Sequence, residues 1–319
     1  MLKRYQVIDG RFCDGTEECG PVLVYVNPDE AERRYLLNEL KIDEHTLASS
    51  LDPDELARME FEPEHVAMIV KRPRNYSVEE QYLFRVSSMG LFLFRDRLVI
   101  VAPDEIVPLE GKQFQKVGSL PDLVLRVLFR TTLHYLEHLK IINQISDELE
   151  SKVQTAMENR HLINLFTLEK GMVYYHNAIH SNGVVIEKLK ASAVKMGFTP
   201  ENLEFLDDLA VENAQCYKQA EIFSNIFASL MDARAGIVNN NLSVLIKRLT
   251  IINVVFLPMN FLAGVGGMSE FSMMTTGIPW WVAYPAFGGV MLGIAAITYT
   301  IIRRMGSEPR PRRRRRAQR

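Results

Sequence analysis

Cysteine is scarce in this chain of 319 residues, which contains only Cys13, Cys19 and Cys216. Three cysteines are too few for a disulfide framework, and a cytoplasmic body would keep them reduced. The sequence also lacks a GxxxxGK[ST] phosphate-binding loop, an HExxH motif and a recognisable Ser-His-Asp arrangement. These absences argue against an ATP-driven pump and against an enzyme, and no cofactor is expected.

Charge is missing from two long stretches near the C-terminus. Residues 249–268 read LTIINVVFLPMNFLAGVGGM, and residues 278–302 read IPWWVAYPAFGGVMLGIAAITYTII. At ~1.5 Å per helical residue, each stretch is long enough to cross a hydrocarbon layer of ~30 Å. We therefore predict two transmembrane helices, joined by an external loop at residues 269–277.

The distribution of basic residues predicts the orientation of these helices. Lys247 and Arg248 precede the first span, residues 303–319 contain nine Arg and one Glu, and the loop at 269–277 contains no Lys or Arg. Positively charged flanks stay in the cytoplasm, so both termini are expected on the cytoplasmic side of a bacterial inner (plasma) membrane. The N-terminal MLKRYQVIDG has no apolar core of a secretory signal. The basic tail at 303–319 is expected to bind anionic lipid headgroups rather than nucleic acid.

The remainder of the chain divides into two predicted parts. Residues 1–118 alternate β-rich and helical stretches, which is typical of an α/β domain. Helices are expected to start at Asp29-Glu30 and Asp43-Glu44, where acidic residues occupy the first turn. Strands are expected at 23–27, 65–70, 81–89 and 91–102.

Residues 119–248 are predicted to form a helical stalk. Two amphipathic stretches, 121–157 and 160–196, indicate a helical hairpin. Proline is absent from residues 201–257, so we expect residues 203–266 to form one helix that enters the membrane without a break. A helix of this length needs partners, and two spans per chain are too few to enclose an aqueous path. The pattern therefore favours a symmetric homo-oligomer.

One face of this long helix is unusually polar for a membrane span. Amide side chains among lipid tails are costly, so such residues face a wet path or a bundle interior. In a ring of chains, amide oxygens would meet the water shell of a hard cation, and apolar collars would gate by dewetting. The alternative is that the amides only hold helices together and that Asp232 lies on a solvated face. The candidate ion path comprises Asn239, Ser243, Ile246, Thr250, Asn253, Leu257 and Asn260, with Asp232 as a cytoplasmic acidic ring.

Two histidine pairs suggest a metal site in the hairpin. His134 and His138, and likewise His176 and His180, are spaced i, i+4 on one helix face. Imidazoles at this spacing can chelate Zn²⁺, and His138 and His180 are equally far from the turn. The alternative is that all four are ordinary packing or surface histidines.

The stretch DARAGIVNNNLSVLIKRLTIINVVFLPMNFLAGVGGM (232–268) resembles the stalk and first membrane helix of the CorA superfamily of divalent-cation channels. MGLFLFRDRLVIVAP (89–103) is similar to the core of that family's cytoplasmic α/β domain. The resemblance implies a homopentamer with a funnel-shaped cytoplasmic domain and a pore lined by the first membrane helix. It also implies that cytosolic ions bound between subunits near Asp232 hold the ring closed, with Asp96 or Asp104 as candidate partners.

The external loop departs from the family pattern. The family's Gly-Met-Asn motif falls on Gly267, Met268 and Ser269, so a hydroxyl replaces the longer amide, and Glu270 follows directly. Because the motif implies Mg²⁺ and the superfamily includes zinc transporters with a different motif, both ions stay open.

We expect a channel that moves Zn²⁺ or Mg²⁺, driven by the membrane potential and the ion gradient. The alternative is a non-conducting oligomeric scaffold or metal sensor that recruits a cytoplasmic partner.

Overall fold

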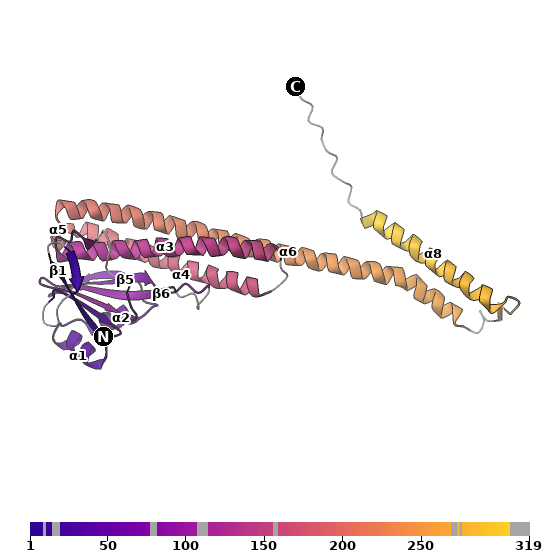
Figure 1. Ribbon diagram of the computed structural model, residues 1–319, viewed down its shortest axis with the longest axis horizontal. Helices are drawn as coiled ribbons and strands as arrows, with labels where there is room; N and C mark the ends of the chain where they lie inside the picture. The colour runs from indigo at the N-terminus through magenta and orange to yellow at the C-terminus, as the bar shows by residue number, and fades with distance from the viewer. Residues whose placement is uncertain are drawn as a thin grey trace, which may run out of the picture. The chain divides into compact units, whose positions relative to one another are not determined.

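The computed structural model describes residues 1–8, 11–14, 20–76, 82–106, 114–155, 159–268, 273–274 and 276–306. The chain forms two compact units, Met1–Ala233 and Arg234–Arg319. The first contains a sheet and long helices, and the second contains two helices of membrane-spanning length and composition (Figure 1). This is the predicted class of an α/β domain followed by long helices and two C-terminal membrane helices.

A seven-stranded sheet forms the centre of the first unit. The strand order is β2-β1-β3-β7-β6-β5-β4, and only the β3–β7 pair is parallel among these strands. The strands span Leu2–Ile8 (β1), Arg11–Asp14 (β2), Val22–Val26 (β3), Arg58–Phe61 (β4), Val66–Pro73 (β5), Val86–Leu93 (β6) and Leu98–Ala102 (β7).

Helices cover both faces of the sheet. On one face, α1 (Glu30–Asn38) and α2 (Glu44–Leu51) pack Leu36 and Leu47 against Phe92. On the other face, α3 (Leu120–Thr155), α4 (Asn159–Ala191) and α6 (Pro200–Gly266) pack against Leu91 and Ile100. Because neighbouring strand residues point to opposite faces and both faces are covered, β6 and β7 are buried at nearly every position.

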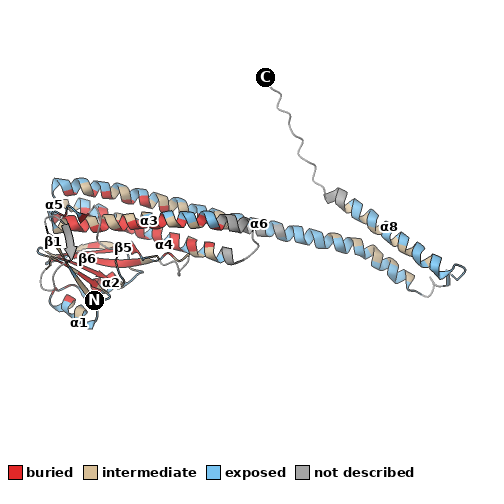
Figure 2. Ribbon diagram, viewed as in Figure 1, coloured by how far each residue is buried: buried red, intermediate tan, exposed pale blue. Residues whose placement is uncertain are grey.

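The long helices continue past the sheet as a helical layer with its own apolar core. Tyr135 and Leu139 of α3, Tyr175 of α4, and Cys216 and Phe227 of α6 are all buried in it. Figure 1 shows α3, α4 and the first part of α6 side by side, and Figure 2 shows that their facing sides are buried. The short helix α5 (Ala193–Met196) links α4 to α6.

Both predicted helix starts are confirmed. Asp29 caps α1 in a capping box with Glu32, and the Asp43 side chain accepts a hydrogen bond from the Thr46 backbone N–H of α2. The predicted unbroken helix is also confirmed, since α6 extends over 67 residues from Pro200 to Gly266. The hairpin helices lie close to their expected bounds.

The strand prediction at 81–89 and 91–102 was wrong in its break point. Strand β6 continues through Gly90, and the turn lies later, where the Phe94 N–H donates to the Arg97 carbonyl at 2.9 Å. A Cβ atom on Gly90 would lie 2.6 Å from Cβ of Ser50. The glycine therefore lets α2 pack close to the sheet and does not mark a turn. Strands β1, β2 and β4 were not predicted.

Helix α4 completes the edge of β5 where strand β4 stops. Strand β4 pairs with β5 from Val66 to Ile69. Further along, Asn182 Oδ1 accepts from the Lys71 N–H at 2.8 Å, and Asn182 Nδ2 donates to the Lys71 carbonyl at 2.6 Å. The amide of one side chain thus replaces the missing strand, and both residues are buried.

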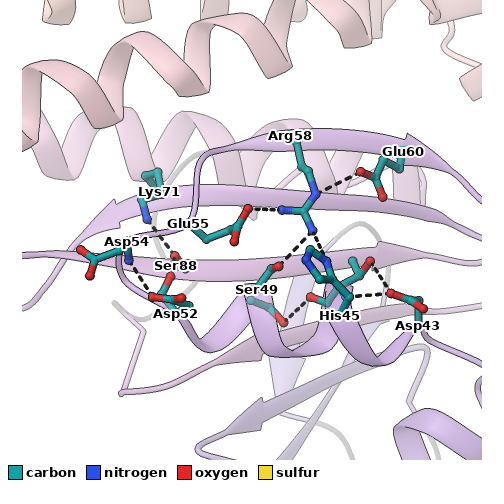
Figure 3. A network of polar contacts seen from close by, with 12 residues as sticks. Asp43, His45, Ser49, Asp52, Asp54, Glu55, Arg58, Glu60, Lys71 and Ser88 are labelled. Atoms are coloured by element: carbon teal, nitrogen blue, oxygen red, sulfur yellow. Dashed lines mark hydrogen bonds and ion pairs between the residues drawn. The ribbon is translucent and has the colours of Figure 1, made fainter.

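Lys71 also anchors the loop after α2. Its Nζ donates to the Pro53 carbonyl at 2.6 Å. It also donates to Ser88 Oγ at 2.9 Å (Figure 3). Burial lowers the pKa of Lys71, and the nearby Asp52 and Asp54 oppose that shift. On the same side, Arg58 of β4 forms a polar network whose partners are Glu55, Glu60, Ser49 and His45.

Replacing Asn182 with Ala is expected to destabilise the first unit by roughly 2–4 kcal/mol, because it leaves a buried N–H and a buried carbonyl of Lys71 unpaired. The measurement is the midpoint of thermal unfolding of the detergent-solubilised protein, followed by far-UV circular dichroism. Asn177→Ala, at an exposed position on the same helix, is the matched control and should leave the midpoint nearly unchanged. Equal midpoints for the two variants would contradict this role of Asn182.

Candidate functional site

The predicted polar stripe lies along one helix, α6. Residues spaced by three and four fall on one face of a helix, and all seven stripe positions from Asn239 to Asn260 are exposed in the single chain. Leu257 is 70% exposed and Ile246 is 54% exposed, although both are apolar. A face that carries exposed amides and exposed leucine side by side suits a surface that further copies of the chain complete.

The polar groups on this face differ in what they bond. Ser243 Oγ donates to the Asn239 carbonyl at 2.9 Å, and Thr250 Oγ1 donates to the Ile246 carbonyl at 2.8 Å. Such bonds back to the preceding turn use up the hydroxyl hydrogens within the helix. Among the described residues, no hydrogen-bond partner is seen for the side chains of Asn253 and Asn260. Within the membrane-spanning stretch Leu242–Gly266, these two amides are therefore the stripe groups available to a water shell.

Helix α6 ends at the predicted external motif. The Gly267 N–H donates to the Ala263 carbonyl at 3.0 Å, and the Met268 N–H donates to the Val265 carbonyl at 3.1 Å. These bonds satisfy the last carbonyls of the helix. Ser269 and Glu270 lie outside the described residues, so their role as an ion-binding loop stays a prediction.

A close contact between the two membrane helices was missed by sequence reasoning. Helix α8 (Trp280–Gly306) approaches the end of α6 so closely that a Cβ atom on Gly266 would lie 2.7 Å from Cζ of Phe287. The signal was present in the two consecutive glycines at 266 and 267, of which only Gly267 was considered, as part of the loop motif. Small residues permit this kind of approach between membrane helices.

Gly266→Leu is expected to destabilise the second unit by about 1–3 kcal/mol, because its side chain would overlap the Phe287 ring. The measurement is the fraction of detergent-extracted protein that stays monodisperse in size-exclusion chromatography after heating. Gly264→Ala is the control, since a Cβ atom there meets nothing within 4 Å. Partial recovery in the double variant Gly266→Leu/Phe287→Ala would assign the loss to this contact, and an unaffected Gly266→Leu would refute it.

The two histidine pairs do not converge on a metal site. His138 Nδ1 lies 2.7 Å from the Tyr175 hydroxyl, and the His134 and His138 rings pack edge to face at 4.4 Å. His176 and His180 instead lie against the ring of Tyr217, at 4.5 and 5.4 Å. Among the described residues, no three His, Cys, Asp or Glu side chains come together as metal ligands. The four histidines therefore do not meet in this structure. His138 lies against Tyr175, whereas His176 and His180 lie against Tyr217.

His134 and His138 are buried among aromatic and aliphatic side chains of α3 and α4. Burial lowers the pKa of His134 to about 3 and that of His138 to about 4, both from 6.5. The proximity of His138, Arg130 and Arg72 lowers the pKa of His134 further. Both imidazoles are consequently neutral in the folded protein at neutral pH.

This burial predicts a loss of stability in acid. The unfolded chain takes up protons below pH 6.5, while the folded chain does not until about pH 4 at His138. The free energy of unfolding should therefore fall as the pH drops through this window, by ~1.4 kcal/mol per pH unit for each histidine. His138→Gln should remove about half of this slope in thermal unfolding measured between pH 6.5 and 4.5. The exposed His180→Gln should retain the parent slope, and an unchanged slope in His138→Gln would contradict the assignment.

The acidic candidates in the first unit differ in their surroundings. Asp232 is exposed on α6, in keeping with either a ring or a solvated face. Asp104 is instead held within its own domain by ion pairs with Arg72 and Arg74 and by the Ser87 hydroxyl at 3.1 Å. Asp96 pairs with the adjacent Arg97 at 2.6 Å, which lowers the pKa of Asp96. Asp104 is thus the less suitable partner for an added cation.

The fold and this stripe together define a class of protein: a two-pass membrane protein with an α/β domain and a long helix that continues into the first span. A sequence model of the family described as "CorA-like Mg2+ transporter protein" matches residues 23–304. The chain therefore belongs to the CorA-like Mg²⁺ transporter family.

Individual relatives agree with this placement. The chain is 23% identical over 261 residues to the cobalt/magnesium transport protein CorA of Methanocaldococcus jannaschii, covering 76% of this chain and 78% of that one. It is 27% identical over 164 residues to the protein of the same description from Thermotoga maritima, covering 50% and 46%. The complete structure of the CorA magnesium transporter from M. jannaschii matches with a TM-score of 0.69 at 19% identity, covering 95% of this chain and 96% of that one. This structural likeness establishes the fold.

Proposed function

We propose that this protein is a divalent-cation channel that moves Mg²⁺ and Co²⁺ across the inner membrane as a homopentamer. The observation that carries the proposal is the exposed polar stripe of α6, which ends at Asn260 beside an exposed Leu257. In a ring of five chains, each stripe residue would become a collar around a wet path. The membrane potential supplies ~2.3 kcal/mol per charge per 100 mV, and twice that for a dication, so inward flux needs no nucleotide.

The choice of ions rests on the relatives. Both curated relatives are described as cobalt/magnesium transport proteins. Zinc has less support, because the histidine pairs do not form a ligand cluster among the described residues. The resemblance predicts Asn at position 269. Ser269 would offer a hydrated ion a hydroxyl on a shorter side chain, so the first contact between the ion and the loop would be weaker. Glu270 beside it would concentrate cations at the mouth.

The remaining predicted features belong to this proposal. Both termini would lie in the cytoplasm, with the arginine-rich residues 303–319 against anionic headgroups. Asp232 would form an acidic ring on the cytoplasmic side, where ions bound between subunits would favour the closed state. No enzymatic step is assigned, and no feature of the described residues favours the alternative of a non-conducting scaffold.

Asn260→Leu is expected to lower Mg²⁺ influx into proteoliposomes by roughly tenfold or more, because it replaces a collar of amides with a dry apolar one. Influx is measured with an enclosed Mg²⁺ indicator under an inside-negative potential, with Co²⁺ and Zn²⁺ compared in the same preparation.

Met259→Leu, one residue off the stripe, is the matched control and should conduct like the parent. Parent-like flux through Asn260→Leu would place Asn260 outside the path. A parent protein without divalent flux would favour the scaffold, and flux of Zn²⁺ without Mg²⁺ would overturn the ion assignment.

A further inference from the structure

A cavity of about 490 Å³ lies within the first unit, and none of its lining residues belongs to the proposed ion path. Its walls come from the loop after α2, the residues that lead into β6, and the middle of α4. The volume falls in the range of pockets that hold small organic ligands, about 300–1,000 Å³. No step of the proposed cation conduction uses this cavity, so a ligand that binds there would be a separate small molecule.

Aromatic side chains line part of the cavity, and one of them, Phe84, is held in place by contacts with other rings. Phe84, which is buried, stacks on Tyr76 with ring centroids 4.8 Å apart and meets Tyr175 edge to face. Gly171 lets α4 lie close to the residues that lead into β6, since a Cβ atom there would lie 3.1 Å from the Phe84 carbonyl oxygen. The lining also includes Phe166 of α4, which is 57% exposed. An exposed aromatic side chain such as Phe166 at a preformed cavity favours a ligand with a flat ring.

Two cationic groups line the same cavity. Arg85 and Lys170 both contribute to its lining, and neither forms an ion pair with a described carboxylate. Lys170 Nζ lies 6.0 Å from the centroid of the Tyr174 ring, which forms part of the wall. Cationic side chains that have no acidic partner, placed beside aromatic rings, favour an anionic substituent on that flat ring.

One acidic group narrows the ligand class further. Asp54 lines the cavity, and its loop is held in place because the Asp54 N–H donates to Asp52 Oδ1 at 2.9 Å (Figure 3). A carboxylate accepts hydrogen bonds and repels a plain anion. The cavity thus suits a ring that carries both an anionic group and a separate N–H donor.

We propose that this cavity binds a purine nucleoside monophosphate, with the ring against Phe166 and the phosphate toward Arg85 and Lys170. The exocyclic amine of an adenine ring supplies the donor that suits Asp54. The inference does not rest on the proposed conduction, and loss of either leaves the other standing.

The test is isothermal titration of AMP into the detergent-solubilised full-length protein, without added divalent cations so that no metal bridges the phosphate. Lys170→Gln and Arg85→Gln should each weaken binding by roughly tenfold, because each removes a charge-assisted contact. Phe166→Ala should also weaken it, and this exposed position tolerates truncation. Lys140→Gln, an exposed lysine on α3 outside the cavity, should bind AMP like the parent.

Adenosine and inorganic phosphate separate the two halves of the site. Support requires that adenosine bind more weakly than AMP and that phosphate at the same concentration fail to displace AMP. The proposal is overturned if the parent protein does not bind AMP at millimolar concentration. It is equally overturned if Lys170→Gln and Arg85→Gln bind as the parent does, or if phosphate alone competes fully.

Discussion

An amide side chain among lipid tails needs a partner, and this constraint governs the second unit. Helix α6 carries Asn253 and Asn260 within a stretch of membrane-spanning length, and the described part of the chain offers them none. Ser243 and Thr250 avoid the problem by bonding to their own helix. The two amides lack that option, because their satisfaction depends on water or on other copies of the chain. In the proposed channel, oligomerisation and a wet path would together meet this requirement.

The first unit gives the start of this helix a firm attachment. Leu206 of α6 belongs to the core beneath the sheet, while Cys216 and Phe227 belong to the core shared with α3 and α4. An isolated helix of such length is not stable in water, and tertiary packing supplies what propensity cannot. The buried His134 and His138 lie in the same helical layer, where their rings pack against each other and the His138 ring packs against Tyr175.

Local signals were sufficient for much of the fold. Asp29 and Asp43 were recognised as helix starts because a capping carboxylate acts on neighbouring backbone groups only. The unbroken course of α6 followed from the absence of proline over residues 201–257. Gly90 led to the wrong end for the strand at 81–89. A glycine that lets a neighbouring helix pack closely cannot be told from a glycine in a turn by the sequence alone. The two histidine pairs do not meet in the structure for a related reason: the i, i+4 spacing places each pair on one helix face, but it does not tell which residues pack against that face.

The sequence by itself determined the class of protein: two uncharged spans, a basic flank, a polar stripe and a family resemblance are all properties of the chain read in order. Only the tertiary structure decided that Asn182 completes the edge of β5, that Gly266 admits Phe287, and that Phe84, Arg85 and Lys170 share a cavity. Periodicity and charge along the chain set which face of an element is apolar or polar. Contacts between residues far apart in sequence depend on how those faces dock, and docking is decided by shape and packing across the whole domain.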